Sequence, residues 1–299
     1  MDIISADQLS AKQINDIFQI ADSIAKNKEE LAIKEHTTLA LFFQEPSTRT
    51  RTSFEVAMVH LGGHAVYLGA SETQFRRGES ISDIAKVLSG YCDMIAARLS
   101  HHADILEMAE SATVPMINAL TDLEHPTQAL ADLYTIRAAK GSIKGRRIAF
   151  VGDIATNTAN SLMVMAAKMG AEMSLVGPKE CSPSAVHLTK AKEYGEVSVS
   201  NSMSEGLANA DIIYTDTFVS LGKESEAEER YRIFAPYQVN SEALAYAKED
   251  VQVMHCMPAF RGKEITAEVI DGPKSIVLQQ SNNKLLLNKA IIIYLLKQD

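Results

Sequence analysis

The fold of this chain is decided by three neighbouring stretches: Leu39-Ala40-Leu41-Phe42-Phe43, Ser47-Thr48-Arg49-Thr50-Arg51 and Phe54-Glu55-Val56-Ala57-Met58-Val59-His60-Leu61. The first is wholly apolar and predicts a buried strand, whereas the third is amphipathic and predicts a helix. The pentapeptide between them therefore lies where a strand leads into a helix. Backbone N–H groups and the positive end of the helix dipole favour an anion there. Its hydroxyl and guanidinium groups predict an oxyanion site, for which phosphate is the natural ligand.

An ordinary capped helix start is the alternative interpretation of this pentapeptide, with both arginines exposed to solvent. We favour the anion site because three hydroxyls alternate with two arginines at a strand-to-helix junction. Arg51 is the weaker member, since an acidic side chain nearby would be enough to pair with it.

Apolar segments alternate with helical stretches along most of the chain, which predicts parallel strands joined by crossover helices. The first series of strands is expected at residues 37–43, 65–68, 94–97 and 114–119, with helices from Thr52, Ser80, His102 and His125. The second series is expected at residues 146–151, 173–176, 197–199, 212–215 and 251–255, with helices at 157–169, 182–192 and 203–208. The predicted fold class is α/β, with two doubly wound parallel-sheet domains flanked by helices.

Two segments are expected to link the domains. A helical stretch at residues 128–140 leads into Gly141-Ser142-Ile143-Lys144-Gly145, where we place the hinge. Apolar residues at helical spacing over 282–298 come after both series, and this C-terminal helix is expected to return to the first domain. The predicted domains are therefore residues 1–140 plus 282–299, and residues 141–281.

Composition excludes several classes of function. The 299 residues carry a net charge of −9 and no block of basic residues interleaved with aromatics, so we expect no nucleic-acid partner. Cys92, Cys181 and Cys256 form no CxxC pair, which argues against a metal or redox motif and favours a reducing compartment. The apolar run from Ala290 to Leu296 is too short to span a bilayer, and the N-terminus resembles no signal peptide. A cytoplasmic protein without a membrane partner is expected.

Arg98 comes directly after the strand predicted at residues 94–97, at the strand end where parallel sheets bind ligands. A buried arginine at such a position is costly unless an anion meets it. An internal partner such as Asp93 or Asp104 is the alternative. Because Arg49 lies in a neighbouring loop of the same predicted sheet, we favour a shared ligand.

His125-Pro126-Thr127-Gln128 opens the helix that follows the fourth predicted strand. A histidine here is suited to donating a hydrogen bond to an oxygen that gains negative charge, and Gln128, one turn further on, faces the same way. The alternative is an ordinary helix cap with proline at the first helical position.

Polar residues also follow predicted strands of the second domain. Asp216 and Ser220 follow the strand at residues 212–215, and a carboxylate with a nearby serine suits an amino-acid zwitterion, unless the segment is only a turn before a surface helix. Cys256 follows another strand and is suited to contacting an amine, although a half-buried cysteine is usually inert packing. Asn157 is either a binder or a helix cap. The loop before it lacks the Gly-x-Gly-x-x-Gly pattern of a dinucleotide site.

Taken together, these segments make the chain resemble the aspartate/ornithine carbamoyltransferase family, on its ornithine-using side. The resemblance covers nearly the whole chain in the same order. Its motifs are Ser47-Thr48-Arg49-Thr50-Arg51, Gly78-Glu79-Ser80, Arg98, His125-Pro126-Thr127-Gln128, Asp216-x-x-x-Ser220-Leu221-Gly222 and His255-Cys256-Met257-Pro258. The first and fourth of these are highly specific together.

The resemblance implies a first domain that binds carbamoyl phosphate and a second that binds L-ornithine. The residues implied around carbamoyl phosphate are Ser47, Thr48, Arg49 and Thr50 for the phosphate, Arg98, His125 and Gln128 for the carbamoyl group, and Cys256, Met257 and Lys284. Those implied for ornithine are Asn157, Asp216, Ser220 and Leu221, and the catalytic set is Arg49, Arg98, His125, Asp216 and Cys256. Gln74 resembles a residue that each subunit of a homotrimer, or a multiple of trimers, lends to its neighbour's site.

The implied reaction moves the carbamoyl group to the side-chain amine of L-ornithine, giving L-citrulline and phosphate in arginine biosynthesis, without a metal or cofactor. Whether it runs in the anabolic or the catabolic direction stays open. The chain departs from the family at Leu221 for methionine, Met257 for leucine, Ala155-Thr156-Asn157 for an Asn-Asn turn, and Lys284 for arginine. Aspartate, putrescine or a modified ornithine are therefore alternative acceptors. A nucleotide-dependent oxidoreductase and a non-catalytic phosphate-binding protein are the alternatives from other classes.

Overall fold

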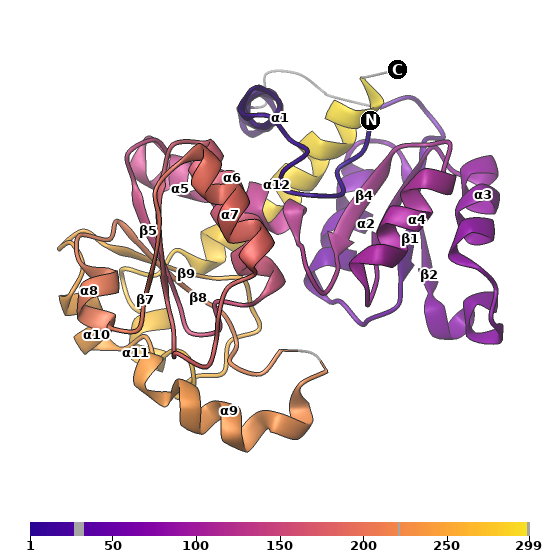
Figure 1. The fold of residues 1–299 in the computed structure, drawn as a ribbon. Coiled ribbons are helices and arrows are strands. Elements are labelled where there is room, and N and C mark those ends of the chain that lie inside the picture. The colour runs from indigo at the N-terminus through magenta and orange to yellow at the C-terminus, as the bar shows by residue number, and fades with distance from the viewer. Residues whose placement is uncertain (27–32, 221, 298–299) are drawn as a thin grey trace. The chain divides into compact units, whose positions relative to one another are not determined.

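The computed structural model describes residues 1–26, 33–220 and 222–297, and the chain forms two compact units (Figure 1). Unit 1 comprises Met1–Ala131 and Asn282–Asp299, and unit 2 comprises Asp132–Ser281. Each contains one parallel sheet flanked by helices, so the predicted α/β fold class is confirmed.

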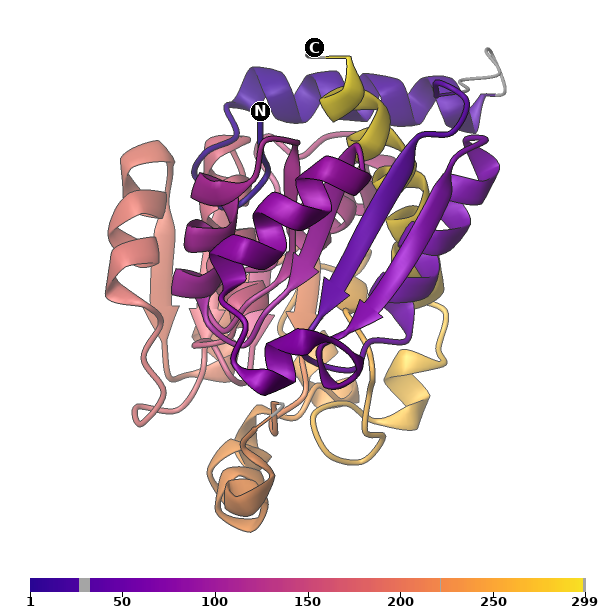
Figure 2. The ribbon, with the colours of Figure 1, turned by 90° about the vertical axis from the view of Figure 1, so that its right-hand side faces the viewer.

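Unit 1 has a four-stranded sheet in the order β2-β1-β3-β4, and every neighbouring pair is parallel. Its strands are β1 (Thr38–Phe43), β2 (His64–Gly69), β3 (Met94–Arg98) and β4 (Met116–Leu120). Its helices are α1 (Ala11–Ala25), α2 (Arg49–His60), α3 (Ile81–Tyr91) and α4 (His102–Ser111), with the 3-10 turns η1 (Ala70–Glu72) and η2 (Gln74–Arg77). The arrowheads of β1 and β2 lie at the same edge of the sheet (Figure 2).

The core of unit 1 follows from the near-continuous apolar strands that a sheet covered on both faces requires. Ala40 and Phe42 of β1 pack with Ile95 of β3 against apolar residues of α3 and α4, on one face of the sheet. Leu39, Leu41 and Phe43 alternate with them and are also fully buried, so they lie on the opposite face. Both faces of β1 are therefore covered, and only its carboxyl end is left for a ligand.

Unit 2 has a five-stranded parallel sheet in the order β7-β6-β5-β8-β9. Its strands are β5 (Arg147–Val151), β6 (Glu172–Val176), β7 (Val197–Ser200), β8 (Ile212–Thr215) and β9 (Gln252–His255). Its helices are α6 (Asn157–Lys168), α7 (Ala185–Tyr194), α8 (Met203–Leu207), α9 (Ala227–Phe234), α10 (Ser241–Ala245) and α11 (Ala267–Ile270), with the 3-10 turns η3 (Glu224–Glu226) and η4 (Ala235–Tyr237). A core of residues such as Val151, Ile213 and Val253 joins its strands to α8, α10 and α11.

Two helices cross the division between the units. The first is α5 (Pro126–Lys140), which divides between Ala131 and Asp132, and the second is α12 (Val277–Leu296), which divides at Asn282. The sequence places the first division at residue 140, at the end of α5. The difference arises because Asp132 already bonds to side chains of unit 2.

Several element boundaries differ from the predicted ones, and some elements were not predicted. The predicted helix from Thr52 begins at Arg49, because the first turn of α2 includes the polar residues of the pentapeptide. The C-terminal helix begins at Val277 instead of residue 282. The helices α1, α9, α10 and α11 were not predicted. For α9, α10 and α11 the reason is that short or charged stretches give weak periodic signals. In α1 the signal was present and was overlooked, because its apolar residues recur at helical spacing and Ser10 and Gln13 form a capping box.

The strand orders locate one switch point in each sheet, and open parallel sheets bind ligands at this position. In unit 1 the chain moves from β1 outward to β2 and then returns to β3 on the other side of β1. In unit 2 it moves from β5 through β6 to β7 and returns to β8. The loops after β1 and β3, and those after β5 and β8, are therefore the places to look for ligand groups.

Candidate active site

The loop after β1 in unit 1 places hydroxyl and amide groups at the start of α2. Thr48 is the N-cap residue of α2, but its side chain makes no hydrogen bond to the backbone N–H groups of the first turn, so its hydroxyl is not used in capping. Ser47 is half-buried and Thr50 is buried. The side chain of Arg49, the first residue of α2, forms no ion pair or hydrogen bond with any other residue the structure describes. These groups leave the helix N-terminus ready to accept an anion.

Arg51 differs from Arg49 although both belong to the pentapeptide. Its Nε donates to Glu55 at 3.0 Å, and its guanidinium carbon lies 3.4 Å from the ring centroid of Tyr67. The charge of Arg51 is therefore used locally, and pairing with a nearby acid is the correct interpretation for this residue.

Arg98 is the last residue of β3 and lies opposite Phe43, the last residue of β1. It is only 7% exposed, and its Nε has no hydrogen-bond partner. Burial lowers the pKa of its guanidinium to about 10, partly offset by the charge of Glu45 and reinforced by that of Arg49. Asp93, the alternative internal partner, instead accepts from the backbone N–H of Thr38 at 2.8 Å. Although the carboxylate of Glu45 is near enough to act on its charge, Arg98 forms no ion pair within 4.0 Å with a carboxylate of the described residues, as expected of a ligand-binding arginine.

His125 precedes the first residue of α5, and its carbonyl accepts from the N–H groups of Gln128 and Ala129. Burial, together with the positive charges of Lys284 and Arg98, holds the pKa of His125 well below its usual range. The ring is therefore neutral at pH 7. A neutral imidazole keeps one N–H with which to donate to a carbonyl or oxyanion.

Lys284 of α12 donates from Nζ to Oε1 of Gln128 at 2.8 Å, and both side chains are buried. The structure therefore brings Lys284 together with Gln128, His125 and Arg98 in unit 1. A lysine there adds positive charge without the two-pronged geometry of an arginine.

Gln74 lies on η2 and is exposed, and no contact of the described residues joins it to the other site residues of unit 1. The single chain thus does not gather Gln74 into the cluster around Arg98. This placement leaves its role in a neighbouring subunit a prediction.

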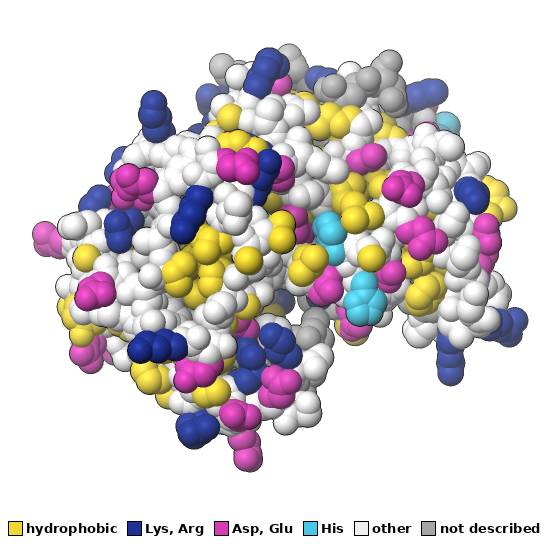
Figure 3. Space-filling view, viewed as in Figure 1, with side chains coloured by type: hydrophobic (Ala, Val, Ile, Leu, Met, Phe, Trp, Pro, Cys, Tyr) yellow, Lys and Arg dark blue, Asp and Glu magenta, His cyan; other side chains and the backbone are white. Residues whose placement is uncertain are grey.

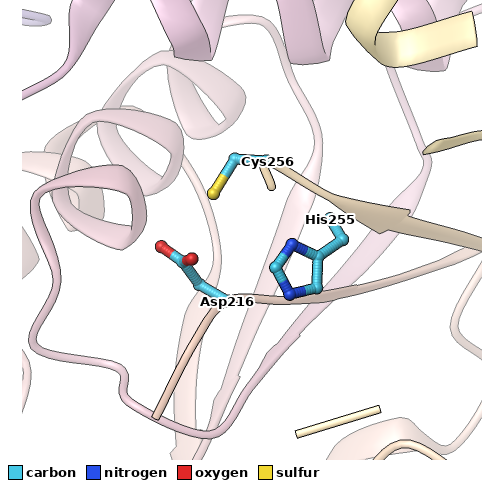
Figure 4. A group of neighbouring side chains, drawn as sticks. All are labelled: Asp216, His255 and Cys256. Atoms are coloured by element: carbon cyan, nitrogen blue, oxygen red, sulfur yellow. The ribbon is translucent and has the colours of Figure 1, made fainter. Parts of the chain in front are cut away.

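Unit 2 gathers Asp216, His255 and Cys256, which follow or end the adjacent strands β8 and β9. Their carboxylate oxygen, ring nitrogen and sulfur atoms lie within 4.8 Å of one another. Figure 4 shows the Cys256 thiol and the Asp216 carboxylate pointing toward each other, with the His255 ring beside them. Burial raises the pKa of Asp216, and the neighbouring His255 ring and a hydrogen bond from Cys256 lower it in part. A buried carboxylate next to a thiol is suited to holding an amine.

His255 is poorly placed to bind a metal ion, because both ring nitrogens have protein partners. Nδ1 accepts from the N–H of Met257 at 2.9 Å, so the ring proton is assigned to Nε2, which lies 3.2 Å from Oε1 of Glu264. Asp216 likewise accepts from the N–H of Thr217 at 2.7 Å. The donor set does not fit a metal site, and the prediction that none is used stays a prediction.

A buried hydrogen-bond network, which was not predicted from the sequence, contacts the strand ends that carry Asp216, His255 and Cys256. The Tyr214 hydroxyl donates to Asp132 at 3.0 Å, and Gln280 donates to Asp132 at 2.7 Å. Gln280 also accepts from the backbone N–H of His255 at 2.9 Å. The network thus fixes the ends of β8 and β9. Its members lie far apart in the chain and show no local motif, so pairwise contacts could not be predicted.

The remaining predicted residues of unit 2 are placed as follows. Asn157 is the first residue of α6, and the cap is Thr156, whose hydroxyl accepts from the N–H of Ala159 at 3.2 Å. Ser220 is half-buried in the loop after β8, and Met257 is half-buried after Cys256. Leu221 lies outside the described residues. The cap alternative for Asn157 is therefore wrong, whereas its role as a binder stays a prediction.

The fold and the two sites define the class of protein. Unit 1 presents unpaired arginines at a sheet switch point, and unit 2 presents a buried carboxylate and a thiol at another. This combination is typical of a transferase that pairs a phosphorylated donor with an amine acceptor.

The chain belongs to the aspartate/ornithine carbamoyltransferase family. The family's carbamoyl-P binding domain matches residues 1–138, and its Asp/Orn binding domain matches residues 144–295. The resemblance seen in the sequence motifs is thereby confirmed.

Similar proteins agree with this membership. The anabolic ornithine carbamoyltransferase of Pyrococcus furiosus is 47% identical over 281 residues, which cover 92% of this chain and 88% of that protein. The ornithine carbamoyltransferase of Bacillus subtilis is 44% identical over 296 residues, covering 97% and 92%. A solved structure of the Pyrococcus furiosus enzyme matches with a TM-score of 0.94 at 43% identity, covering 100% of this chain and 97% of the other.

Proposed function

We propose that this protein transfers the carbamoyl group of carbamoyl phosphate to the side-chain amine of L-ornithine, giving L-citrulline and phosphate. Family membership and relatives named ornithine carbamoyltransferase support this reaction. The structural observation that carries it is the buried, unpaired guanidinium of Arg98 beside Arg49 at the switch point of unit 1. A scaffold protein has no reason to bury an arginine without a partner, because this destabilises the fold.

In unit 1 the proposed ligand is carbamoyl phosphate. Ser47, Thr48 and Thr50, the amide groups of the first turn of α2 and Arg49 hold the phosphate group. The carbamoyl oxygen accepts from Arg98, from neutral His125 and from Thr50. Gln128 binds the carbamoyl nitrogen through its amide, held in orientation by the hydrogen bond from Lys284.

In unit 2 the proposed ligand is L-ornithine. Asp216 accepts hydrogen bonds from the side-chain amine, and Cys256 lies next to the same nitrogen. Asn157, Ser220 and Leu221 bind the amino-acid end of the substrate. The described residues of the loop after β8 include no arginine, and their one lysine, Lys223, lies 3.9 Å from the carboxylate of Asp153. This does not favour a second carboxylate such as that of aspartate.

The chemistry follows from the charges that develop. The ornithine amine must lose a proton, because an ammonium has no lone pair with which to attack the carbamoyl carbon. A new C–N bond forms while the electrons of the carbonyl move onto its oxygen, which Arg98 and His125 stabilise. The oxyanion then re-forms the C=O bond, the C–O bond to phosphate breaks, and its electron pair leaves with the phosphate, stabilised by Arg49. The nitrogen loses its extra proton to the departing phosphate, and the proton lost before attack goes to solvent, so that a neutral citrulline nitrogen and phosphate result. Each such donor is worth about 2.7–4 kcal/mol.

Assembly and location also belong to the proposal. A homotrimer, or a multiple of trimers, in which Gln74 reaches a neighbour's site fits the exposure of this residue on η2. The anabolic name of the Pyrococcus furiosus relative supports a place in arginine biosynthesis. Among the helices that the structure describes, none combines the length and apolar content needed to cross a membrane. A cytoplasmic location stays a prediction.

The test is citrulline formation from carbamoyl phosphate with ornithine, compared with product formation with aspartate and with putrescine. We expect turnover with ornithine to exceed the others by far. Preference for aspartate or putrescine would overturn the acceptor and keep the reaction class. No turnover with any amine would overturn the enzymatic reaction altogether.

A further inference from the structure

The helix α9 follows the loop that carries Asp216 and Ser220 and is rich in charged residues. Side chains of both signs gather over α9 on the surface (Figure 3). Arg232 is typical of them, with a side chain 78% exposed, whereas the side chain of Arg230 on the same helix is only 13% exposed. Arg230 is therefore turned toward the body of unit 2.

Arg230 connects two loops at the switch point of unit 2. Its Nε donates to the carbonyl oxygen of Phe218 at 2.6 Å, in the loop after β8. Its terminal nitrogen Nη2 donates to the carboxylate of Asp153, in the loop after β5. Asp153 is 1% exposed, so the ion pair is shielded from solvent and from salt on this side.

Asp153 in turn organises the loop before α6. Its Oδ1 accepts from the N–H of Ala155 at 3.1 Å and from the thiol of Cys181 at 3.1 Å. This loop leads directly to Asn157, the first residue of α6. The Arg230–Asp153 pair therefore fixes the loop that presents Asn157 relative to the loop that presents Asp216 and Ser220.

Apolar packing holds the same contact together. The ring of Phe218 stacks on Phe234 of α9 with centroids 5.2 Å apart, and the guanidinium carbon of Arg230 lies 5.0 Å from the Phe234 ring. Gly152 makes room for this arrangement, because a Cβ there would lie 2.7 Å from the Phe218 ring. Its φ of +105° also favours glycine. Arg230 is thus fixed by both polar and aromatic contacts within unit 2.

We propose that Arg230 is a positioning residue for binding of the amine acceptor. It holds the loop after β5 and the loop after β8 in fixed positions relative to each other, through its contacts with Asp153 and Phe218. This inference rests on the proposed function and deepens it. Arg230 touches neither reacting atom in this scheme. Its loss leaves Asp216 and Asn157 present but misplaced, and small misplacements of binding groups strongly weaken productive binding.

The test compares Arg230→Met with Arg232→Met, a matched control that removes an exposed arginine two residues further along α9. We expect the KM for ornithine to rise by about tenfold or more in Arg230→Met, and the KM for carbamoyl phosphate to stay within about twofold of wild type. Arg230→Lys keeps the positive charge but not the planar guanidinium with its several N–H donors, so its KM for ornithine should lie between those of wild type and Arg230→Met. Asp153→Asn should reproduce the ornithine effect from the other partner.

A second measurement does not depend on turnover. Hydrogen–deuterium exchange in the protein without substrates should be faster in residues 214–220 of Arg230→Met than in wild type or Arg232→Met. Equal ornithine KM and equal exchange in Arg230→Met and Arg232→Met would overturn the proposal. So would an equal rise of both KM values with a lowered melting temperature, which indicates a general structural role. If wild-type protein makes no citrulline, the proposed function fails, and the exchange comparison still decides whether Arg230 holds the loop.

Discussion

The two ligand sites of this protein handle charge in opposite ways. In unit 1, the side chains of Arg49 and Arg98 lie at the switch point and form no ion pair with a carboxylate of the described residues, and Nε of Arg98 is buried with no acceptor. In unit 2, Asp216 accepts from Thr217 and Cys256, and Asp153 is paired with Arg230. The first site is incomplete until an anion arrives, whereas the second is already satisfied by its own chain.

This difference shows where each site obtains its specificity. An unpaired buried cation destabilises the folded protein, and a phosphorylated ligand removes this cost on binding. A satisfied site gains less from charge and depends more on the placement of its groups. We therefore expect substitutions of the unpaired arginines in unit 1 to lower activity and to raise the free energy of unfolding. Substitutions in unit 2 should alter acceptor use or weaken the fold.

The largest effect is expected for Arg98→Met. Turnover should fall by about 10²–10³-fold, because a donor to the developing oxyanion is lost. The free energy of unfolding without ligand should rise by about 1–4 kcal/mol, because a buried charge is replaced by an apolar side chain of similar length. Citrulline assays and urea unfolding measure the two quantities.

A matched ligand experiment is the control for this substitution. Phosphate at about 100 times its dissociation constant should stabilise the wild type by about 2.7 kcal/mol, and the same concentration should stabilise Arg98→Met far less. A variant that is less stable than wild type without ligand would contradict the contrast between the two sites.

The next effect is expected for Asp216→Asn. The KM for ornithine should rise by about 10–100-fold, since hydrogen bonds between charged groups are lost, and phosphate binding should be unchanged. The fold should tolerate the change, because burial already raises the pKa of Asp216 and disfavours its charge. Loss of phosphate binding in this variant would mean that the ligands are assigned to the wrong units.

Tyr214→Phe tests whether removing a polar group from the satisfied network of unit 2 lowers stability. Asp132 would lose one of its two side-chain donors described above, so the protein should be destabilised by about 1–3 kcal/mol, whereas Arg98→Met gains stability. Phosphate binding should not change. Thermal unfolding of both variants side by side measures the contrast, and an unchanged unfolding temperature for Tyr214→Phe would argue against it.

The smallest effect concerns pH and His125. The folded protein keeps His125 neutral below pH 6.5, whereas the unfolded chain takes up a proton there, so the unfolded state binds more protons. Stability should therefore fall as the pH drops below about 6.5, by up to about 1.4 kcal/mol per pH unit. Urea unfolding at about pH 7.5 and 5.5 should show about 1 kcal/mol greater loss in wild type than in His125→Gln. Equal losses would show that His125 is not held neutral.

Much of the fold could be predicted from the sequence. Alternating apolar and helical stretches predicted each strand that the structure describes, in chain order, because local periodicity reports which segments are buried. Strand-end residues such as Arg98, His125 and Asp216 were also visible, since ligand groups in parallel sheets follow the carboxyl ends of strands. The short helices α10 and α11 and the charged α9 were missed, because their local signal is weak and packing decides their form.

The sequence by itself determined the class of fold, the oxyanion loop of Ser47 to Arg51 and the types of polar side chain at the strand ends. These features depend on local composition and spacing. Only the tertiary structure decided which charges are satisfied. It separated Arg49, which has no partner in the described chain, from Arg51, which pairs with Glu55. It also joined Arg230 to Asp153 and Gln280 to His255 across long stretches of sequence. Such pairings follow from distances between distant segments, which no local pattern encodes.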